Sequence, residues 1–221
     1  MNSGWSVHMV RVKICGITSE KDVEILNRYL PDYAGFVFAK SRRQLTADQA
    51  GRLAGMLADS IRKVGVFVNA VQDDILEAVA VAGLDAVQLH GDETPEDIER
   101  LRFRLDSGIE IWKAIRVKDA GSINELGGYS ADRFILDTYA EDSYGGAGKS
   151  FDWKCAEAAG TYRCILLAGG LNPDNVAAAI KSVKPFAVDV SSGVESDGSK
   201  DEAKIRDFMN AVKEVEGKRL I

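Results

Sequence analysis

The chain has 221 residues, of which 46% are hydrophobic and 28% charged, with 21 glycines and 4 prolines. This length and balance predict a single globular domain with a substantial core, and they exclude a disordered or collagen-like chain. Lys and Arg number 28 against 34 Asp and Glu, so the net charge of −6 excludes a general electrostatic attraction for nucleic acid or an anionic membrane.

Short apolar runs alternate with longer amphipathic segments along the chain, which is the pattern of repeated βα units around a parallel sheet. The predicted strands are Val10–Cys15, Tyr33–Phe38, Lys63–Val68, Ala86–Leu89, Ile111–Arg116, Arg133–Asp137, Cys164–Ala168 and Phe186–Val190. Each strand is followed by a segment that can form a helix, so eight βα units are expected.

Several of these helices carry recognisable start signals. Thr18 or Ser19 can cap a helix that runs to about Tyr29, and Thr46 can cap one whose apolar residues share a face. A third helix is predicted over Asp73–Ala82. Thr94 followed by Pro95, and later Asn172 followed by Pro173, each place a cap before a helix-starting proline.

Eight consecutive βα units can form an open doubly wound sheet or a closed (βα)8 TIM barrel. The first strand is followed by Cys15-Gly16-Ile17-Thr18 instead of a glycine-rich dinucleotide fingerprint, and polar residues follow many strands instead of one switch point. Both observations favour the barrel.

We expect the barrel to occupy residues 10–217, after a disordered or vector-derived extension at 1–9 and before a C-terminal tail at 218–221. Thr138–Ser150, with Gly145–Gly148, is predicted to form a long loop of the kind that often serves as a lid.

The remaining composition restricts the environment and the chemistry. Two histidines and three cysteines (His8, His90, Cys15, Cys155 and Cys164) are too widely spaced for a zinc site or a disulfide framework. No apolar run approaches the about 18 residues that a membrane span needs, and the first residues do not form a signal peptide. We therefore expect a cytoplasmic protein with free thiols.

Function in a barrel is read from the carboxyl ends of its strands. Cys15 ends the first predicted strand, where its sulfur would face the barrel mouth and could act as a base or a nucleophile, although a lone cysteine is commonly a small core residue. Asp137 ends the sixth strand after an apolar run, a setting that suits a general acid, although a cap or a loop ion pair is an equal alternative. Strands one and six lie across a barrel from each other, so the pair would suit an isomerisation.

Glycine-rich segments follow strands seven and eight, where barrels commonly bind phosphate through backbone N–H groups. Their candidate residues are Gly169, Gly170, Ser191, Ser192 and Gly193.

Four further side chains near strand ends can contact a substrate. Arg42 and Arg43 follow the second strand, and a guanidinium can hold a carboxylate through two hydrogen bonds, although a solvated basic loop is the simpler interpretation. His90 follows the fourth strand, on the same side as Gln88, and is either a hydrogen-bonded structural residue or part of the site. Asp189 lies within the eighth strand and needs a partner if it is buried, for which a substrate hydroxyl is a candidate.

These residues resemble the phosphoribosylanthranilate isomerase family of tryptophan biosynthesis over nearly the whole chain. The matching segments, in order, are Lys13-Ile14-Cys15-Gly16, Gly35-Phe36-Val37-Phe38, Val64-Gly65-Val66-Phe67, Gln88-Leu89-His90-Gly91, Gly148-Lys149-Ser150-Phe151-Asp152-Trp153, Leu167-Ala168-Gly169-Gly170-Leu171 and Asp189-Val190-Ser191-Ser192-Gly193-Val194-Glu195. Two positions depart from the family pattern. Arg42 stands where a proline is common, and Ala147 stands where a threonine is common.

The resemblance implies an Amadori rearrangement of N-(5′-phosphoribosyl)anthranilate that needs no cofactor and no metal. By this resemblance, Asp137 protonates the ring oxygen and Cys15, as a thiolate, removes the proton from C2′. Arg43 aligns with the arginine that holds the anthranilate carboxylate, and Asp189 and His90 align with substrate contacts. The glycine and serine residues after strands seven and eight form the implied phosphate site. A phosphosugar is the expected partner, and the protein is expected to be a monomer or a homodimer.

Two other classes compete with this assignment. One is a non-catalytic phosphosugar-binding barrel, which would lack either the acid or the base, whereas this chain has both Cys15 and Asp137. The other is a different phosphosugar enzyme on the same barrel. An indole-glycerol-phosphate synthase would need a catalytic lysine and glutamate at strand ends, whereas Lys13 and Lys113 lie in the middle of strands. A ribulose-phosphate epimerase would need a metal held by several His and Asp, and the one usable histidine of this chain cannot build that site.

Overall fold

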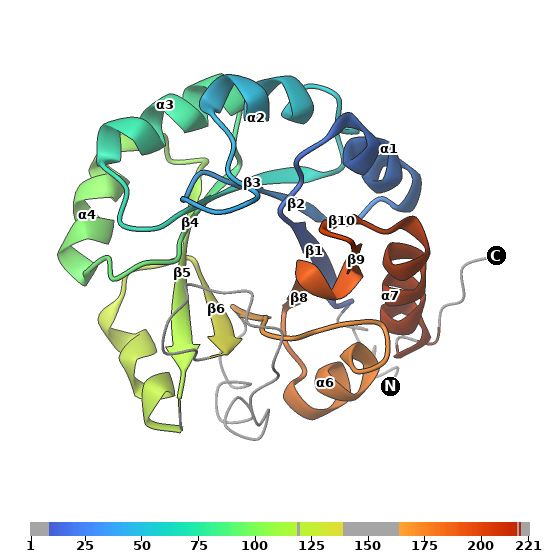
Figure 1. Ribbon diagram of the computed structural model, residues 1–221. Helices are drawn as coiled ribbons and strands as arrows, with labels where there is room; N and C mark the ends of the chain where they lie inside the picture. The colour runs from blue at the N-terminus through green and yellow to red at the C-terminus, as the bar shows by residue number, and fades with distance from the viewer. Residues whose placement is uncertain (1–8, 119, 139–163, 216, 218–221) are drawn as a thin grey trace, which may run out of the picture.

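A closed barrel of eight parallel strands forms the centre of the molecule (Figure 1). The computed structural model describes residues 9–118, 120–138, 164–215 and 217. The strands are β1 (Arg11–Cys15), β2 (Tyr33–Val37), β3 (Arg62–Phe67), β4 (Ala86–Leu89), β5 (Glu110–Val117), β6 (Arg133–Thr138), β7 (Ile165–Leu167) and β8 (Ala187–Val190). They follow chain order around the barrel, and β1 pairs with β8 to close it. The predicted (βα)8 barrel is confirmed, with every strand within about two residues of its expected bounds.

Helices surround the barrel (Figure 1). They are α1 (Glu20–Tyr29), α2 (Ala47–Ala54), α3 (Gln72–Ala82), α4 (Pro95–Arg104), the 3₁₀ helix η1 (Ala120–Gly128), α6 (Val176–Val183) and α7 (Glu202–Val215). After β8 the chain also forms a 3₁₀ turn, η3 (Ser192–Val194), and a small hairpin of β9 (Glu195–Ser196) and β10 (Ser199–Lys200). The segment after β5 is thus a 3₁₀ helix where an ordinary amphipathic helix was expected.

Three of the predicted caps are present as capping boxes. The side chains of Ser19, Thr46 and Thr94 each accept a hydrogen bond from the backbone N–H three residues later, and the side chain of that later residue accepts one in return. Ser19, not Thr18, caps α1. These reciprocal bonds satisfy amide groups that the first helical turn leaves without partners.

The predicted helix start at Asn172-Pro173 is wrong, since α6 begins at Val176. The Asn172 side-chain oxygen accepts from the amides of Asp174 and Asn175, at 2.9 and 3.1 Å, and so closes a turn of its own. Asn172 therefore stabilises the turn that leads into the helix, and Asn175 occupies the cap position.

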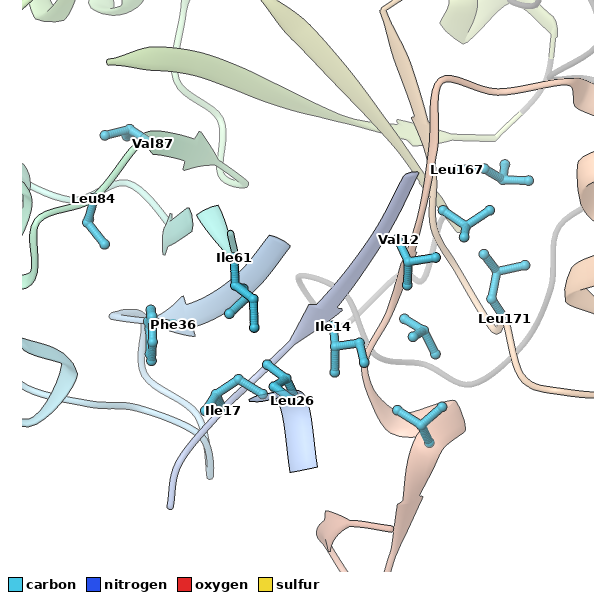
Figure 2. Packing of buried hydrophobic residues seen from close by; sticks show 14 of the residues in the cluster. Val12, Ile14, Ile17, Leu26, Phe36, Ile61, Leu84, Val87, Leu167 and Leu171 are labelled. Carbon is cyan, nitrogen blue, oxygen red and sulfur yellow. The ribbon is translucent and has the colours of Figure 1, made fainter. Parts of the chain in front are cut away.

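Strand alternation divides the core into two parts. One cluster fills the barrel interior: Tyr33, Val64, Ala86, Trp112, Ala114, Ile135, Leu166, Ala168 and Ala187. A larger cluster lies between the strands and the helices, and it includes Val12 and Ile14 of β1 (Figure 2). The intervening Lys13 therefore has its side chain on the interior side of β1, as does Cys15 at the strand end.

The amino ends of the strands lie at one end of the barrel, opposite their carboxyl ends. Charged side chains cluster there around Glu110. Arg62 and Arg133 both form ion pairs with Glu110, at 3.2 and 3.0 Å, and the Trp112 indole N–H donates to it at 2.7 Å. The Arg133 guanidinium also lies 3.9 Å from the centre of the Phe186 ring. This Glu110 cluster closes the amino-terminal end of the barrel, which in such folds contributes to stability and does not hold the active site.

Some predicted features lie outside the described residues. These are residues 1–8 of the extension at 1–9, the tail at 218–221, residues 139–150 of the glycine-rich loop with the family-like segment through Trp153, and Cys155. Cys164, which is described, comes directly before β7 and packs against the larger core cluster, as expected for a structural cysteine.

Candidate active site

A pocket of about 610 Å³ opens among the carboxyl ends of the strands. Of the residues that the sequence singled out for the site, all but Arg42 line it: Cys15, Arg43, His90, Asp137, Gly169, Gly170, Asp189, Ser191, Ser192 and Gly193. They come from β1, β6 and β8 and from the segments that follow β2, β4, β7 and β8. The barrel topology therefore brings together residues that are up to 178 positions apart in the chain (Cys15 and Gly193).

Cys15 is the last residue of β1 and is partly exposed in the pocket. Its neighbour in the sheet is Gly35 of β2, and a Cβ at that position would lie 2.8 Å from the Cys15 sulfur. Glycine therefore leaves the space that the thiol occupies. Burial raises the pKa of Cys15 above its ordinary value, and the charge of Lys13 acts against that rise. The free thiol is thus the favoured form at neutral pH.

Lys13 lies beneath Cys15 on the same side of β1 and is completely buried. Its ammonium donates to a carboxylate oxygen of Asp189 on β8, at 2.8 Å, and the two residues are direct neighbours in the sheet. Burial lowers the pKa of Lys13, but the charges of Asp189 and Cys15 outweigh it and raise the pKa above its ordinary value. Lys13 thus remains a cation whose charge acts on the thiol.

Asp137, at the end of β6, is buried against His90. The His90 Nε2 lies 3.1 Å from an Asp137 carboxylate oxygen, and the Gln88 side-chain nitrogen lies 2.8 Å from the His90 Nδ1. With the Gln88 amide donating to Nδ1, the hydrogen of the neutral imidazole sits on Nε2 and faces Asp137. His90 is therefore placed to donate a hydrogen bond to the Asp137 carboxylate.

Arg43 and Arg42 differ in where they lie, although both pair with Glu195. Arg43 lines the pocket with a side chain that is 16% exposed, whereas the Arg42 side chain is 56% exposed and is not among the lining residues. Arg43 donates through Nε and Nη2 to the two oxygens of Glu195, at 2.8 and 2.9 Å. The structure thus assigns the pocket position to Arg43.

The segments after β7 and β8 meet at the pocket wall. Gly169 and Gly170 both have positive φ angles, 80° and 66°, which other residues rarely adopt. A Cβ at Gly193 would overlap the carbonyl oxygen of Leu171, so glycine is required for the two segments to approach. The Ser191 hydroxyl donates to the Cys15 carbonyl at 3.0 Å and ties the β8 segment to β1.

Two buried acceptors in the pocket wall lack partners. Within the described part of the chain, Oε1 of Gln88 and Oδ1 of Asp189 receive no hydrogen bond although both are buried. Both residues line the pocket. Because buried polar atoms are nearly always paired, these two acceptors indicate a ligand with hydroxyl groups.

Sequence reasoning missed three charged residues near the site. Lys13 had a signal, since it is two residues before Cys15 and must share its face of the strand. Glu195 and Lys200, which contact each other at 3.0 Å across the β9–β10 hairpin, had none, because a two-residue strand carries no readable pattern. Asp189, which was expected to need a partner, has Lys13 as that partner.

The described residues contain neither a metal-binding cluster nor a membrane-spanning helix. No group of three or more His, Cys, Asp and Glu side chains there is arranged to hold a metal ion. None of the helices in the described ranges is long and apolar enough to cross a membrane.

Comparison with known proteins gives consistent matches. Residues 12–211 match the family model described as N-(5'phosphoribosyl)anthranilate (PRA) isomerase. The N-(5'-phosphoribosyl)anthranilate isomerases of Acetivibrio thermocellus and Clostridium acetobutylicum are 50% and 46% identical, covering 95% and 93% of this chain and 98% of each relative.

Solved structures agree with the sequence relatives. A phosphoribosyl anthranilate isomerase from Thermotoga maritima superposes with a TM-score of 0.85 at 39% identity, covering 93% of this chain and all of that one. Another solved structure, with a TM-score of 0.82 at 38% identity and the same coverage, is of an isomerase in complex with reduced 1-(o-carboxyphenylamino)-1-deoxyribulose 5-phosphate.

Proposed function

The chain belongs to the N-(5′-phosphoribosyl)anthranilate isomerase family, and we propose that it carries out its isomerisation by acid–base catalysis between Asp137 and Cys15. The reaction is the Amadori rearrangement of N-(5′-phosphoribosyl)anthranilate to 1-(2-carboxyphenylamino)-1-deoxyribulose 5-phosphate in tryptophan biosynthesis. The observation that supports the assignment of roles is the shared pocket, in which the ends of β1 and β6 present a thiol and a carboxyl group. Membership of this family excludes the two alternative functions, a non-catalytic phosphosugar-binding barrel and a different phosphosugar enzyme.

Asp137 opens the ring. As a carboxylic acid it donates its proton to the ribose ring oxygen, the bond between that oxygen and C1′ breaks, and the anthranilate nitrogen forms a double bond to C1′. The resulting Asp137 carboxylate accepts a hydrogen bond from the Nε2–H group of His90. The contact of Gln88 with Nδ1 sets this tautomer of the imidazole. This arrangement stabilises the charge that the first step produces.

Cys15 completes the rearrangement. Its thiolate removes the proton from C2′, and the electrons of that C–H bond neutralise the positively charged imine and give an enolamine. Loss of the enol proton and protonation at C1′ then yield the ketone, so no atom is gained or lost overall. Lys13 supports the thiolate, because its positive charge lowers the pKa of Cys15.

The two ends of the substrate are both anionic, and each meets a suitable group. We assign the carboxylate of the anthranilate ring to Arg43, and the phosphate to the backbone of Gly169 and Gly170 together with the β8 segment, Ser191–Gly193. Oδ1 of Asp189, which has no partner among the described residues, accepts a hydrogen bond from a ribose hydroxyl. Binding thus depends on local groups, which is required in a chain of net charge −6.

Kinetics of two variants test the acid–base assignment. We expect Cys15→Ala and Asp137→Asn each to lower kcat by about 10² or more with a smaller change in KM, since an acid or a base acts in the transition state. The loss of substrate fluorescence in steady-state assays without added metal measures both constants. Near-normal turnover in either variant would show that another group carries that step.

We further propose a cytoplasmic location, where reducing conditions keep Cys15 and Cys164 as the free thiols that the structure contains. The assembly is a monomer or a homodimer, and sedimentation of the purified protein distinguishes the two.

A further inference from the structure

Glu195 is a buried carboxylate surrounded by three cations at the barrel mouth. It is the first residue of β9, and its side chain is 5% exposed. Besides the two bonds from Arg43, it accepts one from Lys200 at 3.0 Å and pairs with Arg42. One cation would be enough to balance a buried carboxylate, so three indicate that Glu195 has a role in ordering its neighbours.

The bonds to Glu195 use only one edge of the Arg43 guanidinium. Nε and Nη2 face the carboxylate, and among the described residues no acceptor contacts Nη1. The edge formed by Nη1 and Nη2 is therefore left for a second carboxylate. A guanidinium can bind carboxylates through both of these edges at once, because its five N–H groups lie in one plane.

The stem of Arg43 is fixed as well. It crosses Gly16, the residue after Cys15, so closely that a Cβ at Gly16 would overlap the Arg43 Cδ. Gly16 has a φ of 83°, which suits glycine. With its stem against Gly16 and its head against Glu195, Arg43 has little freedom left.

The charge of Glu195 does not cancel that of Arg43. Lys200 is the direct cross-strand partner of Glu195 in the β9–β10 hairpin and is also buried. Arg42, Arg43 and Lys200 together carry three positive charges against the single negative charge of Glu195. The cluster thus keeps a positive excess beside a pocket that must receive an anion.

We propose that Glu195 is a positioning residue, which holds the Arg43 guanidinium side-on so that its remaining edge receives the carboxylate of the substrate. This inference rests on the proposed role of Arg43 in binding that carboxylate. It explains how an arginine on a loop between β2 and α2 gains a fixed orientation, since the hairpin after β8 supplies it.

The first measurement is the effect of Glu195→Gln on steady-state kinetics. A glutamine offers Arg43 one acceptor in place of two, so the guanidinium loses its fixed orientation. We expect KM to rise about five- to tenfold with kcat nearly unchanged, because substrate and transition state lose the same contact. Inhibition by inorganic phosphate, which probes only the phosphate end, should stay as in the parent enzyme. An unchanged KM would overturn the proposal. A loss of kcat and of phosphate inhibition as large as the rise in KM would also overturn it.

A double-mutant cycle separates this proposal from the role of Arg43 itself. If Glu195 acts through Arg43, Arg43→Ala combined with Glu195→Gln has the KM of Arg43→Ala alone. Additive effects would overturn the positioning role, since Glu195 would then act elsewhere. If Arg43→Ala alone leaves KM unchanged, the proposed carboxylate contact is wrong and the positioning role is wrong with it. If only Glu195→Gln leaves KM unchanged, the positioning role alone is wrong.

Arg42→Gln is the matched control, because Arg42 pairs with the same carboxylate but lies outside the pocket lining. Its KM should rise much less than that of Glu195→Gln, and a rise equal to that of Glu195→Gln would overturn the specific link to Arg43. Glu195→Asp serves if the glutamine variant does not fold. It keeps the negative charge but is one methylene too short for both Arg43 bonds, so KM should again rise at unchanged kcat.

Discussion

At the scale of single residues, the most unusual feature is the completely buried ammonium of Lys13. A buried charge is costly unless it is paired, and Asp189 supplies the pair at 2.8 Å. Replacement of a buried ion pair by apolar residues is often neutral for stability, so stability alone does not account for this pair. Their position beneath Cys15 gives them a chemical effect. Burial and Asp189 raise the pKa of the thiol, whereas Lys13 lowers it.

We therefore expect Lys13→Met to raise the pKa of Cys15 further, because the variant loses the cation and leaves Asp189 unpaired. At neutral pH, below that pKa, less thiolate forms, and alkylation of Cys15 by iodoacetamide should slow by about tenfold or more. The rate is measured against pH in a Cys155→Ser, Cys164→Ser background. Its midpoint should move to higher pH.

Lys113→Met is the control for this prediction. Lys113 is also a buried mid-strand lysine, but it pairs with Glu93 at 2.8 Å and has no part in the pKa shift of Cys15. An unchanged midpoint in Lys13→Met, or the same shift in Lys113→Met, would contradict the proposed link.

At the scale of elements, the helix starts are not equally well capped. Capping boxes begin α1, α2 and α4, whereas α3 begins after Val71, whose side chain makes no cap hydrogen bond and is 65% exposed. The backbone at Val71 is already extended, with φ −66° and ψ 139°, as a cap residue requires. Little apolar contact would be lost if this side chain were replaced.

Val71→Ser should therefore stabilise the protein by about 0.5–1 kcal/mol, since a serine oxygen can accept from the first-turn amides of α3. The midpoint of urea unfolding measures the gain. Thr94→Ala, which removes the cap of α4, should lose about 1 kcal/mol in the same assay. A Val71→Ser midpoint at or below that of the parent protein would show that the α3 start does not limit stability.

The sequence carried enough information for the elements and for part of the site. Buried parallel strands are apolar runs, and caps such as Ser19 and Thr94 are local signals, so both could be read directly. The strand ends then placed Cys15 and Asp137. The contacts of Lys13 and Arg43 could not be read, because their partners Asp189 and Glu195 lie 176 and 152 residues away. Such pairs follow from barrel closure, which no local pattern records.

At the scale of the whole molecule, the two ends of the barrel are chemically distinct. The Glu110 cluster joins the starts of β3, β5 and β6 with ion pairs, far along the strands from the pocket residues at their carboxyl ends. Burial raises the pKa of Glu110, but hydrogen bonds from Arg133 and Trp112 outweigh it and bring the pKa below its ordinary value. The native state therefore favours the charged carboxylate.

Glu110→Gln should lower the free energy of unfolding by about 1–2 kcal/mol at pH 7 and leave kcat and KM unchanged. Because the folded pKa is lowered, the stabilisation is complete above the unfolded pKa of about 4.3 and is lost as the pH falls through the folded value. The difference between parent and variant in urea unfolding should thus narrow below about pH 4.3. A pH-independent difference would mean that packing, not charge, accounts for the loss.

The pairing of Lys13 with Asp189 also sets an order of events during synthesis. The ribosome makes β1 first and β8 last, so for most of translation Lys13 has no carboxylate beside it and both edges of the growing sheet remain open. A nascent chain that stops before β8 has neither a closed barrel nor a balanced charge under Cys15. The charge environment of the Cys15 thiol is therefore completed in the same event that closes the barrel, when β8 pairs with β1.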